Sequence, residues 1–156
     1  MDKVALHREL VAVLERELET ITAAQRLSSE GVTHADARAD GNKDMRATEA
    51  SYIARGQALR VTALRDDLER VVGLKVRPFG DEDAVALAAL VTLVDDADRE
   101  TWVFLAPAGG GTTIGDVKVI TPASPLGRAL LGKRTGDSFE VERGGSTDEL
   151  EVISIS

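Results

Sequence analysis

Apolar residues in the first half of the chain recur every three or four positions. A first run comprises Leu10, Leu14, Leu18, Ile21, Ala24 and Leu27, with Glu, Gln and Arg among the positions between them. A second run with the same spacing extends from about Asp44 to Val72. Because an α-helix turns once every 3.6 residues, this pattern predicts two long helices.

The segment from Ser28 to Lys43 separates the two runs. It contains Gly31 and Gly41 together with several Ser, Thr, Asn and Asp residues, which favour turns and helix caps. We therefore expect a turn region here and an antiparallel helical hairpin over residues 1–74. The apolar stripes are narrow, as in a two-stranded coiled coil whose other faces stay in water, although two helices of an ordinary bundle would show the same spacing.

Beyond Gly73 the apolar residues follow the shorter period of strands. Thr101–Leu105 and Val117–Ile120 are predicted strands, and the Pro-Ala-Gly-Gly-Gly sequence at 107–111 predicts a loop between them. The apolar segment 84–94 is also strand-prone, but its first part, residues 84–90, is equally compatible with a helix.

The last part of the chain predicts a β-hairpin. Apolar and polar residues alternate over 139–141 and again over 150–152, and Gly144 and Gly145 lie between these segments as a turn signal. From Ile153 onward the alternation shifts by one residue, which predicts a bulge or twist near the C-terminus.

A short helix with both of its ends encoded lies before this hairpin. Ser124 is a favourable N-cap, and Pro125 suits the first helical position, where a missing N–H costs nothing. Gly132 suits the left-handed residue after the end, and Lys133 favours the negative end of the helix dipole. The residues that would face a core are Leu126, Ala129 and Leu130.

These elements predict an α+β fold. An antiparallel coiled-coil hairpin would be followed, over residues 75–156, by four or five antiparallel strands and one short helix.

The composition excludes several classes of protein. Without cysteine the chain has neither disulfides nor thiolate metal sites, and its longest apolar run is too short to span a bilayer. The first residues lack the apolar core of a secretory signal, so we expect a cytoplasmic protein without membrane contact. The net charge of −8 argues against a dedicated duplex-DNA binder, although it also describes an ordinary solvated acidic surface.

A distinctive sequence motif covers residues 120–133. It reads Ile-Thr-Pro-Ala-Ser-Pro-Leu-Gly-Arg-Ala-Leu-Leu-Gly-Lys and is followed by Gly136 and Asp137. It closely resembles the C-terminal signature of the GreA/GreB transcript-cleavage factors. The resemblance implies an N-terminal coiled-coil hairpin, a small FKBP-like domain at 75–156 and a bacterial RNA polymerase as partner.

The resemblance is weaker in the hairpin, where it rests on residues 37–41 and 49–52. The family pattern there is similar to Ala-Arg-x-x-Gly-Asp-Leu-x-Glu-Asn-x-Glu-Tyr. In this chain Asn42 follows Gly41 where the family has an aspartate, and Met45 and Arg46 replace the expected Glu and Asn. An acidic tip is therefore present, but its register is displaced.

In the family, tip carboxylates enter the secondary channel of the polymerase and act beside its active-site magnesium. The resemblance assigns this role to Asp40 and Asp44, with Asp36 and Glu49 as reserves. These two would share a Mg²⁺ ion with the polymerase, since carboxylates are hard oxygen ligands, and a second metal could activate a water for phosphodiester hydrolysis. The chain would bind no cofactor alone and would not itself be an enzyme. Asp44 is equally explained as an acid in the first turn of a helix, and Asp40 as part of a turn.

The resemblance also implies that the globular domain docks at the rim of the channel. The candidate contact residues are Ser124, Pro125, Leu126 and Arg128. Nucleic acid would be contacted only through the elongation complex, and nothing in the sequence demands self-association, so we expect a monomer.

Two other functions remain open. Some Gre-like proteins bind the same channel and modulate or inhibit the polymerase without promoting cleavage. An FKBP-like domain could instead bind peptides or isomerise prolines, which requires an aromatic-lined pocket. The aromatic residues available in the second half are Phe79, Trp102, Phe104 and Phe139, and some of them must fill the core.

Overall fold

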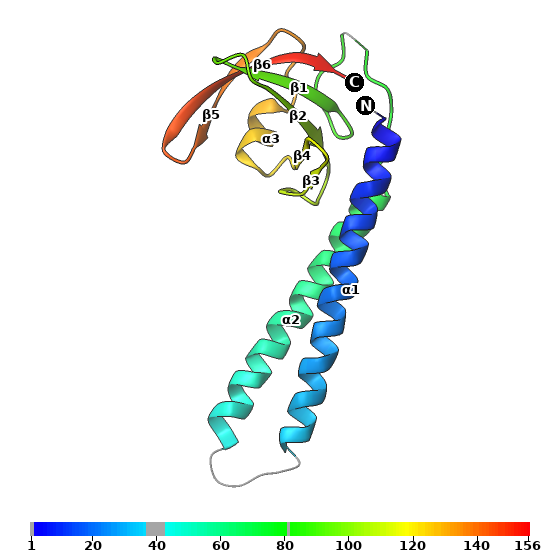
Figure 1. Ribbon diagram of the computed structural model, residues 1–156, viewed down its shortest axis with the longest axis vertical. Coiled ribbons are helices and arrows are strands. Elements are labelled where there is room, and N and C mark those ends of the chain that lie inside the picture. The colour runs from blue at the N-terminus through cyan, green and yellow to red at the C-terminus, as the bar shows by residue number, and fades with distance from the viewer. Residues whose placement is uncertain (1, 37–42, 81) are drawn as a thin grey trace. The chain divides into compact units, whose positions relative to one another are not determined.

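The computed structural model describes residues 2–36, 43–80 and 82–156 (Figure 1). By its internal contacts the chain divides into two units. The helical unit comprises Ala12–Asp66, and the sheet unit comprises Met1–Val11 together with Asp67–Ser156. Both long helices begin or end in the sheet unit and continue without interruption into the helical unit.

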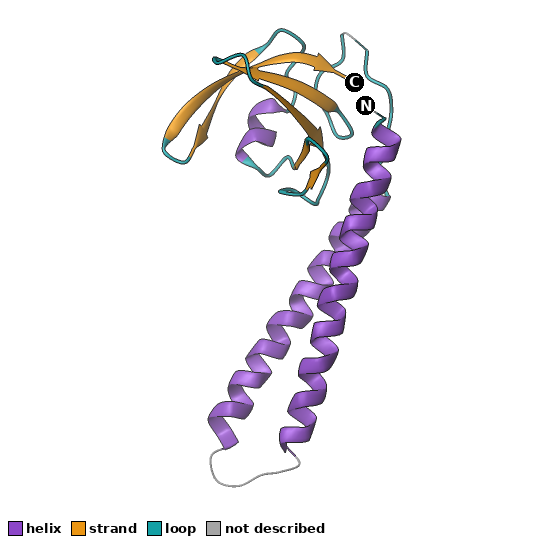
Figure 2. Ribbon diagram, in the orientation of Figure 1, coloured by secondary structure: helices purple, strands orange, loops and turns teal. Residues whose placement is uncertain are grey.

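The two predicted helices are present, as α1 (Lys3–Asp36) and α2 (Lys43–Val72) (Figure 2). The prediction that a turn region begins at Ser28 is wrong, because α1 continues through Gly31 to Asp36. The hydroxyls of Ser28 and Ser29 donate to the carbonyls of Ala24 and Gln25, one turn earlier, at 3.0 Å each. Serines bonded in this way act inside a helix rather than as its caps, and a single glycine costs a helix only about 1 kcal/mol.

Within the helical unit the apolar seam is buried at one end. Leu14, Val61 and Leu64 are buried, and Arg60 lies 3.7 Å from Glu17 in an exposed ion pair. Elsewhere in both helices large apolar side chains are exposed, among them Leu27, Met45, Tyr52, Ile53 and Leu59. The helical spacing predicted the elements correctly but did not predict that the outer part of the stripe is solvated.

Over residues 82–156, six strands form one sheet in the order β3-β4-β2-β1-β6-β5. The strands are β1 (Leu90–Asp95), β2 (Glu100–Leu105), β3 (Thr113–Ile114), β4 (Val117–Ile120), β5 (Ser138–Arg143) and β6 (Ser146–Ile155). The short helix α3 (Pro125–Leu130) lies between β4 and β5 in the sequence. The sequence predicts four or five strands and leaves residues 84–90 open between helix and strand. The structure has loop and turn over 84–89, and Leu90 is the first residue of β1.

The sheet is mixed rather than antiparallel. β2 and β4 run parallel, with Trp102 opposite Val117 and Leu105 opposite Ile120, whereas the other neighbouring strands run antiparallel. The additional strand β3 explains the difference. It forms a tight hairpin with β4, so the chain reverses direction once more after the predicted 107–111 loop, and β4 pairs with β2 in the parallel direction.

The predicted bulge near the C-terminus is confirmed. Thr92 of β1 pairs with Ser154, but the next residue, Leu93, pairs with Val152, so Ile153 is the extra residue on β6. Val152 is buried, whereas Ile153 is 42% exposed. The bulge shifts the alternation of β6 by one residue, so that Ile155 as well as Val152 packs against the core.

The core of the sheet unit lies between the sheet and α3. Alternate residues of the strands contribute Val91, Leu93, Val103, Leu105, Val141 and Val152, and α3 contributes the fully buried Leu130. Leu126 and Ala129 pack against this cluster and are partly buried. Figure 1 shows α3 beneath the central strands, where the predicted apolar face of the helix meets the sheet.

Candidate functional site

The tip residues predicted to act beside a metal lie at the ends of the two helices. Asp36 is the last residue of α1, and Asp44 is the second residue of α2, so both flank the connection between the helices. Asp40 lies outside the described residues. Glu49 lies five residues after Asp44 on α2, and its side chain is exposed. Among the described residues no group of three or more His, Cys, Asp or Glu side chains is placed to hold a metal ion.

The positions that depart from the family pattern are exposed at the start of α2. The side chain of Met45 is 83% exposed, and that of Arg46 is also exposed. Tyr52 and Leu59 follow Met45 at intervals of seven residues, which places the three on one face of α2, and both are exposed. A solvated row of large apolar side chains is typical of a surface that binds a partner.

The predicted docking segment is built around the N-cap of α3. Ser124 has an extended backbone (φ −72°, ψ 153°), and its Oγ accepts a hydrogen bond from the Gly127 N–H at 3.0 Å. The same hydroxyl donates to the Thr121 carbonyl at 2.8 Å. The predicted N-cap is therefore confirmed, and Pro125 occupies the first helical turn as expected.

The four predicted contact residues differ in how much of them a partner could reach. Pro125 and Arg128 are exposed, and the Arg128 guanidinium donates to the Ala123 carbonyl at 2.6 Å. Ser124 is half-buried by its capping role, and Leu126 packs against the core. Of the four predicted contact residues, Pro125 and Arg128 are thus the ones that a partner can reach.

Sequence reasoning missed an exposed apolar residue at the other end of α3. Leu131 follows the helix and is 48% exposed, although it adjoins the fully buried Leu130. Gly132 then has a positive φ of 81°, as predicted, and its N–H donates to the Val85 carbonyl at 2.9 Å. The left-handed turn at Gly132 directs the chain back to the 84–89 segment, which leaves Leu131 outside.

A second cluster that sequence reasoning missed surrounds Phe79 in the sheet unit. The Lys3 ammonium lies 4.7 Å and the Arg77 guanidinium 3.8 Å from the centre of its ring. Burial, and then the nearby Arg77 charge, lower the pKa of Lys3. The Gly80 N–H, followed by the hydrogen bond from Arg77, lowers the pKa of Asp83. The cluster joins the start of α1 to the segment after α2.

Three of the four aromatic residues in the second half, Phe79, Phe104 and Phe139, are already engaged in other contacts. Phe104 and Phe139 are buried, with Phe139 in the core cluster, and Phe79 is covered by its two cations. The prediction that some aromatics must fill the core is confirmed. Across the described part of the chain, no helix combines the length and apolar character needed to cross a bilayer.

Comparisons with known proteins agree over both units. Residues 80–156 match the family model described as transcription elongation factor, GreA/GreB, C-terminal. The transcription elongation factor GreA of Ruegeria pomeroyi is 30% identical over 159 aligned positions, which cover 99% of this chain and 98% of that protein. The transcription inhibitor protein Gfh1 of Thermus aquaticus is 28% identical over 96% of this chain and 91% of its own length.

Among solved structures, the crystal structure of GreA factor homolog 1 (Gfh1) of Thermus thermophilus covers 94% of both chains at 23% identity, with a TM-score of 0.43. The sequence comparisons carry the assignment, because the match to GreA includes the helices as well as the sheet. The capped segment Ser124–Lys133 is thus part of a sequence similarity that spans the whole chain. The chain belongs to the GreA/GreB family of transcription elongation factors.

Proposed function

We propose that the chain binds bacterial RNA polymerase, inserts the connection between α1 and α2 into the secondary channel, and stimulates cleavage of backtracked transcripts. The observation that supports this most directly is the full-length similarity to a protein named transcription elongation factor GreA, which includes the helical unit. An α1 of 34 residues is about 50 Å long, which suits a helix that reaches into a deep channel.

The chemistry would be shared between the two proteins. Asp40 and Asp44 would supply carboxylate oxygens to a magnesium ion held jointly with the polymerase, which suits the hard-ligand preference of this ion. When bound, the ion would activate a water for hydrolysis of the RNA phosphodiester. The chain would hold no cofactor alone and would have no complete active site of its own. Asp36 and Glu49 would support the negative charge of the tip.

Docking would use the exposed part of the α3 segment. Pro125 and Arg128 can be reached by a partner while Ser124 and Leu126 hold the helix in place. A factor that acts on the elongation complex in this way contacts nucleic acid only within it. We expect the active form to be a monomer in the bacterial cytoplasm.

A second candidate is a factor that occupies the channel without promoting cleavage. Two observations favour it. A relative of similar identity is named a transcription inhibitor, and the exposed Met45 and Arg46 stand where the family pattern has polar and acidic residues.

The decisive experiment is transcript cleavage in a defined backtracked elongation complex, with and without the protein. Release of short 3′ RNA fragments that is lost in the Asp40→Ala/Asp44→Ala variant, but kept in Asp116→Ala, would support cleavage through the tip. Asp116 is a suitable control because it is exposed in the sheet unit. Binding and slowed elongation without cleavage would support the second candidate. If the protein neither binds the polymerase nor stimulates cleavage, both candidate functions are contradicted.

A further inference from the structure

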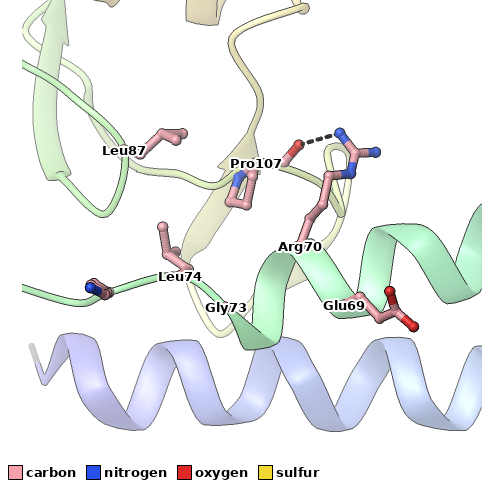
Figure 3. A pocket seen from close by; sticks show the side chains of 7 residues that line it. Glu69, Arg70, Gly73, Leu74, Leu87 and Pro107 are labelled. Atoms are coloured by element: carbon pink, nitrogen blue, oxygen red, sulfur yellow. Dashed lines mark hydrogen bonds between the residues drawn. The ribbon is translucent and has the colours of Figure 1, made fainter.

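A solvent-facing groove in the sheet unit has no residue of α3 in its lining. It has a volume of about 420 Å³ and is lined by residues from the end of α2 and from two loops: Glu69, Arg70, Gly73, Leu74, Lys75, Leu87 and Pro107. Figure 3 shows the side chains of Leu74 and Leu87 directed toward the same space as the Pro107 ring, whereas the Glu69 carboxylate points away from it.

The backbone around Leu87 is held so that this side chain remains outside. Ala88 is a non-glycine residue with a φ of 71°, and its N–H donates to the Leu105 carbonyl at 2.8 Å. The Leu105 N–H in turn donates to the Ala89 carbonyl at 3.0 Å. Ala88 and Ala89 are fully buried, but Leu87 is 40% exposed. A left-handed alanine is disfavoured, so the fold tolerates strain at the position that presents Leu87.

The opposite wall is fixed by Arg70. Its guanidinium donates to the Pro107 carbonyl at 3.3 Å and also pairs with Asp67, so it joins the end of α2 to the loop after β2 (Figure 3). The groove is therefore shaped by hydrogen-bonded backbone on both sides. Preformed apolar sites of this kind bind with a smaller entropic cost than mobile ones.

The unpaired cation among the residues that line the groove is Lys75. Arg70 already has a carboxylate partner, whereas the exposed Lys75 ammonium has no hydrogen bond or ion pair within the described residues. An occupant complementary to the groove carries an apolar side chain that would lie against Leu74, Leu87 and Pro107. Next to this side chain it carries a carboxylate that would pair with the Lys75 ammonium.

We propose that this groove is a second docking site for RNA polymerase, which fills it with a segment carrying a leucine-sized side chain next to an acidic residue. The proposal rests on the function proposed above. A second copy of the chain suits the groove less well, because two molecules of net charge −8 repel each other.

Two variants test the two parts of the site. Leu87→Ser removes the exposed apolar side chain, and Ile153→Ser is its control, since Ile153 is 42% exposed and does not line the groove. Lys75→Glu reverses the unpaired charge, and Lys118→Glu is its control on an exposed position of β4. All are made in the full chain, and their folding is checked by thermal melting. If Leu87→Ser melts early, Leu87→Ala replaces it.

The measurement is the affinity of the labelled protein for core RNA polymerase by fluorescence anisotropy. We expect each groove variant to bind roughly tenfold more weakly, the equivalent of losing one buried leucine or one close charge pair. The controls should stay within about twofold, as surface substitutions normally do. The loss in Lys75→Glu should shrink at high salt.

The other outcomes would overturn the proposal in distinct ways. If wild type binds polymerase and the groove variants bind as tightly as their controls, the second site is wrong and the proposed function stands. If wild type does not bind polymerase at all, the proposed function itself fails. If sedimentation shows a dimer that Leu87→Ser disperses while polymerase binding is unchanged, the occupant is a second copy.

Discussion

Gly127 lies so close to Thr121 that a Cβ atom at position 127 would stand 1.9 Å from the Thr121 carbonyl oxygen. This approach is what allows the Ser124 hydroxyl to bridge the Thr121 carbonyl and the Gly127 N–H in one tight turn. The start of α3 is therefore packed backbone against backbone, with no room for adjustment at this position.

The variant Gly127→Ala should accordingly destabilise the protein. Contacts below 3 Å force the backbone to move, and we expect a loss of about 2–3 kcal/mol in the free energy of unfolding, as for an overpacked core. Urea denaturation followed by circular dichroism measures it. Gly80→Ala is the matched control, because a Cβ there meets nothing within 4 Å. Equal midpoints for the two variants would contradict the tight approach.

The N-cap of the same helix gives a smaller prediction. Ser124→Ala removes the oxygen that accepts the Gly127 N–H, and it should cost about 1 kcal/mol in the free energy of unfolding. Ser124→Asp keeps an acceptor at the cap and should recover most of this loss. The same denaturation experiment compares them, and an Asp variant as unstable as the Ala variant would argue against capping as the role of this side chain.

A substitution at Arg128 should weaken polymerase binding without affecting folding. Its side chain is exposed and makes its hydrogen bond to the Ala123 carbonyl at the surface. We expect Arg128→Glu to change the thermal midpoint little and to weaken polymerase binding by roughly tenfold, as loss and reversal of an interfacial charge do. Anisotropy titration against polymerase measures the affinity. Lys118→Glu, with the same charge reversal on β4, is the control, and comparable losses in both would indicate a non-specific charge effect.

In the helical unit, Gly56→Ala should be stabilising. Gly56 lies in the interior of α2, and a Cβ there would meet nothing within 4 Å. Replacing a helical glycine with alanine gains about 0.5–1 kcal/mol, since the unfolded chain loses conformational freedom. Helix ellipticity during thermal unfolding should show a higher midpoint. A lower midpoint would contradict the open space around this position.

Asp95 predicts a pH dependence of stability. Hydrogen bonds from the Arg99 side chain, and then from the Arg99 and Ala97 backbone N–H groups, hold the pKa of this carboxyl below its usual range. A depressed folded-state pKa adds stability that is present above the unfolded value of about 3.9 and is lost as the pH falls through the folded value. The difference in thermal midpoint between wild type and Asp95→Asn should therefore be larger at pH 6 than at pH 3. Asp96→Asn, a change at the exposed neighbour, serves as control, and parallel curves for wild type and Asp95→Asn would contradict the linkage.

The elements that sequence reasoning predicted correctly are those set by nearby residues. Ser124, Pro125 and Gly132 define α3 through contacts a few positions away, and the turn at Gly144 and Gly145 requires the positive φ that both adopt. The bulge at Ile153 was visible because a shift in alternation is itself a local signal.

The features that sequence reasoning missed depend on distant parts of the chain. The parallel pairing of β2 with β4 follows from the reversal at β3, whose two residues are too few to leave a pattern. Leu87 is exposed only because Ala88 bonds to β2, and Arg70 shapes the groove only by reaching a residue 37 positions away. The role proposed for Asp40 and Asp44 rests on the family resemblance, because the metal that they would share is held by another protein.

The chain has a single tryptophan, Trp102, in β2 of the sheet unit, whereas the helical unit contains most of α1 and α2. Its fluorescence therefore reports on the sheet unit, while ellipticity at the helical band reports mainly on the two long helices. Since both helices pass between the units without a break, the two signals should change together if the chain melts as one cooperative system. Separate midpoints would instead show that the helical unit can unwind while the sheet unit stays folded, a freedom that would let the two long helices adapt to a partner.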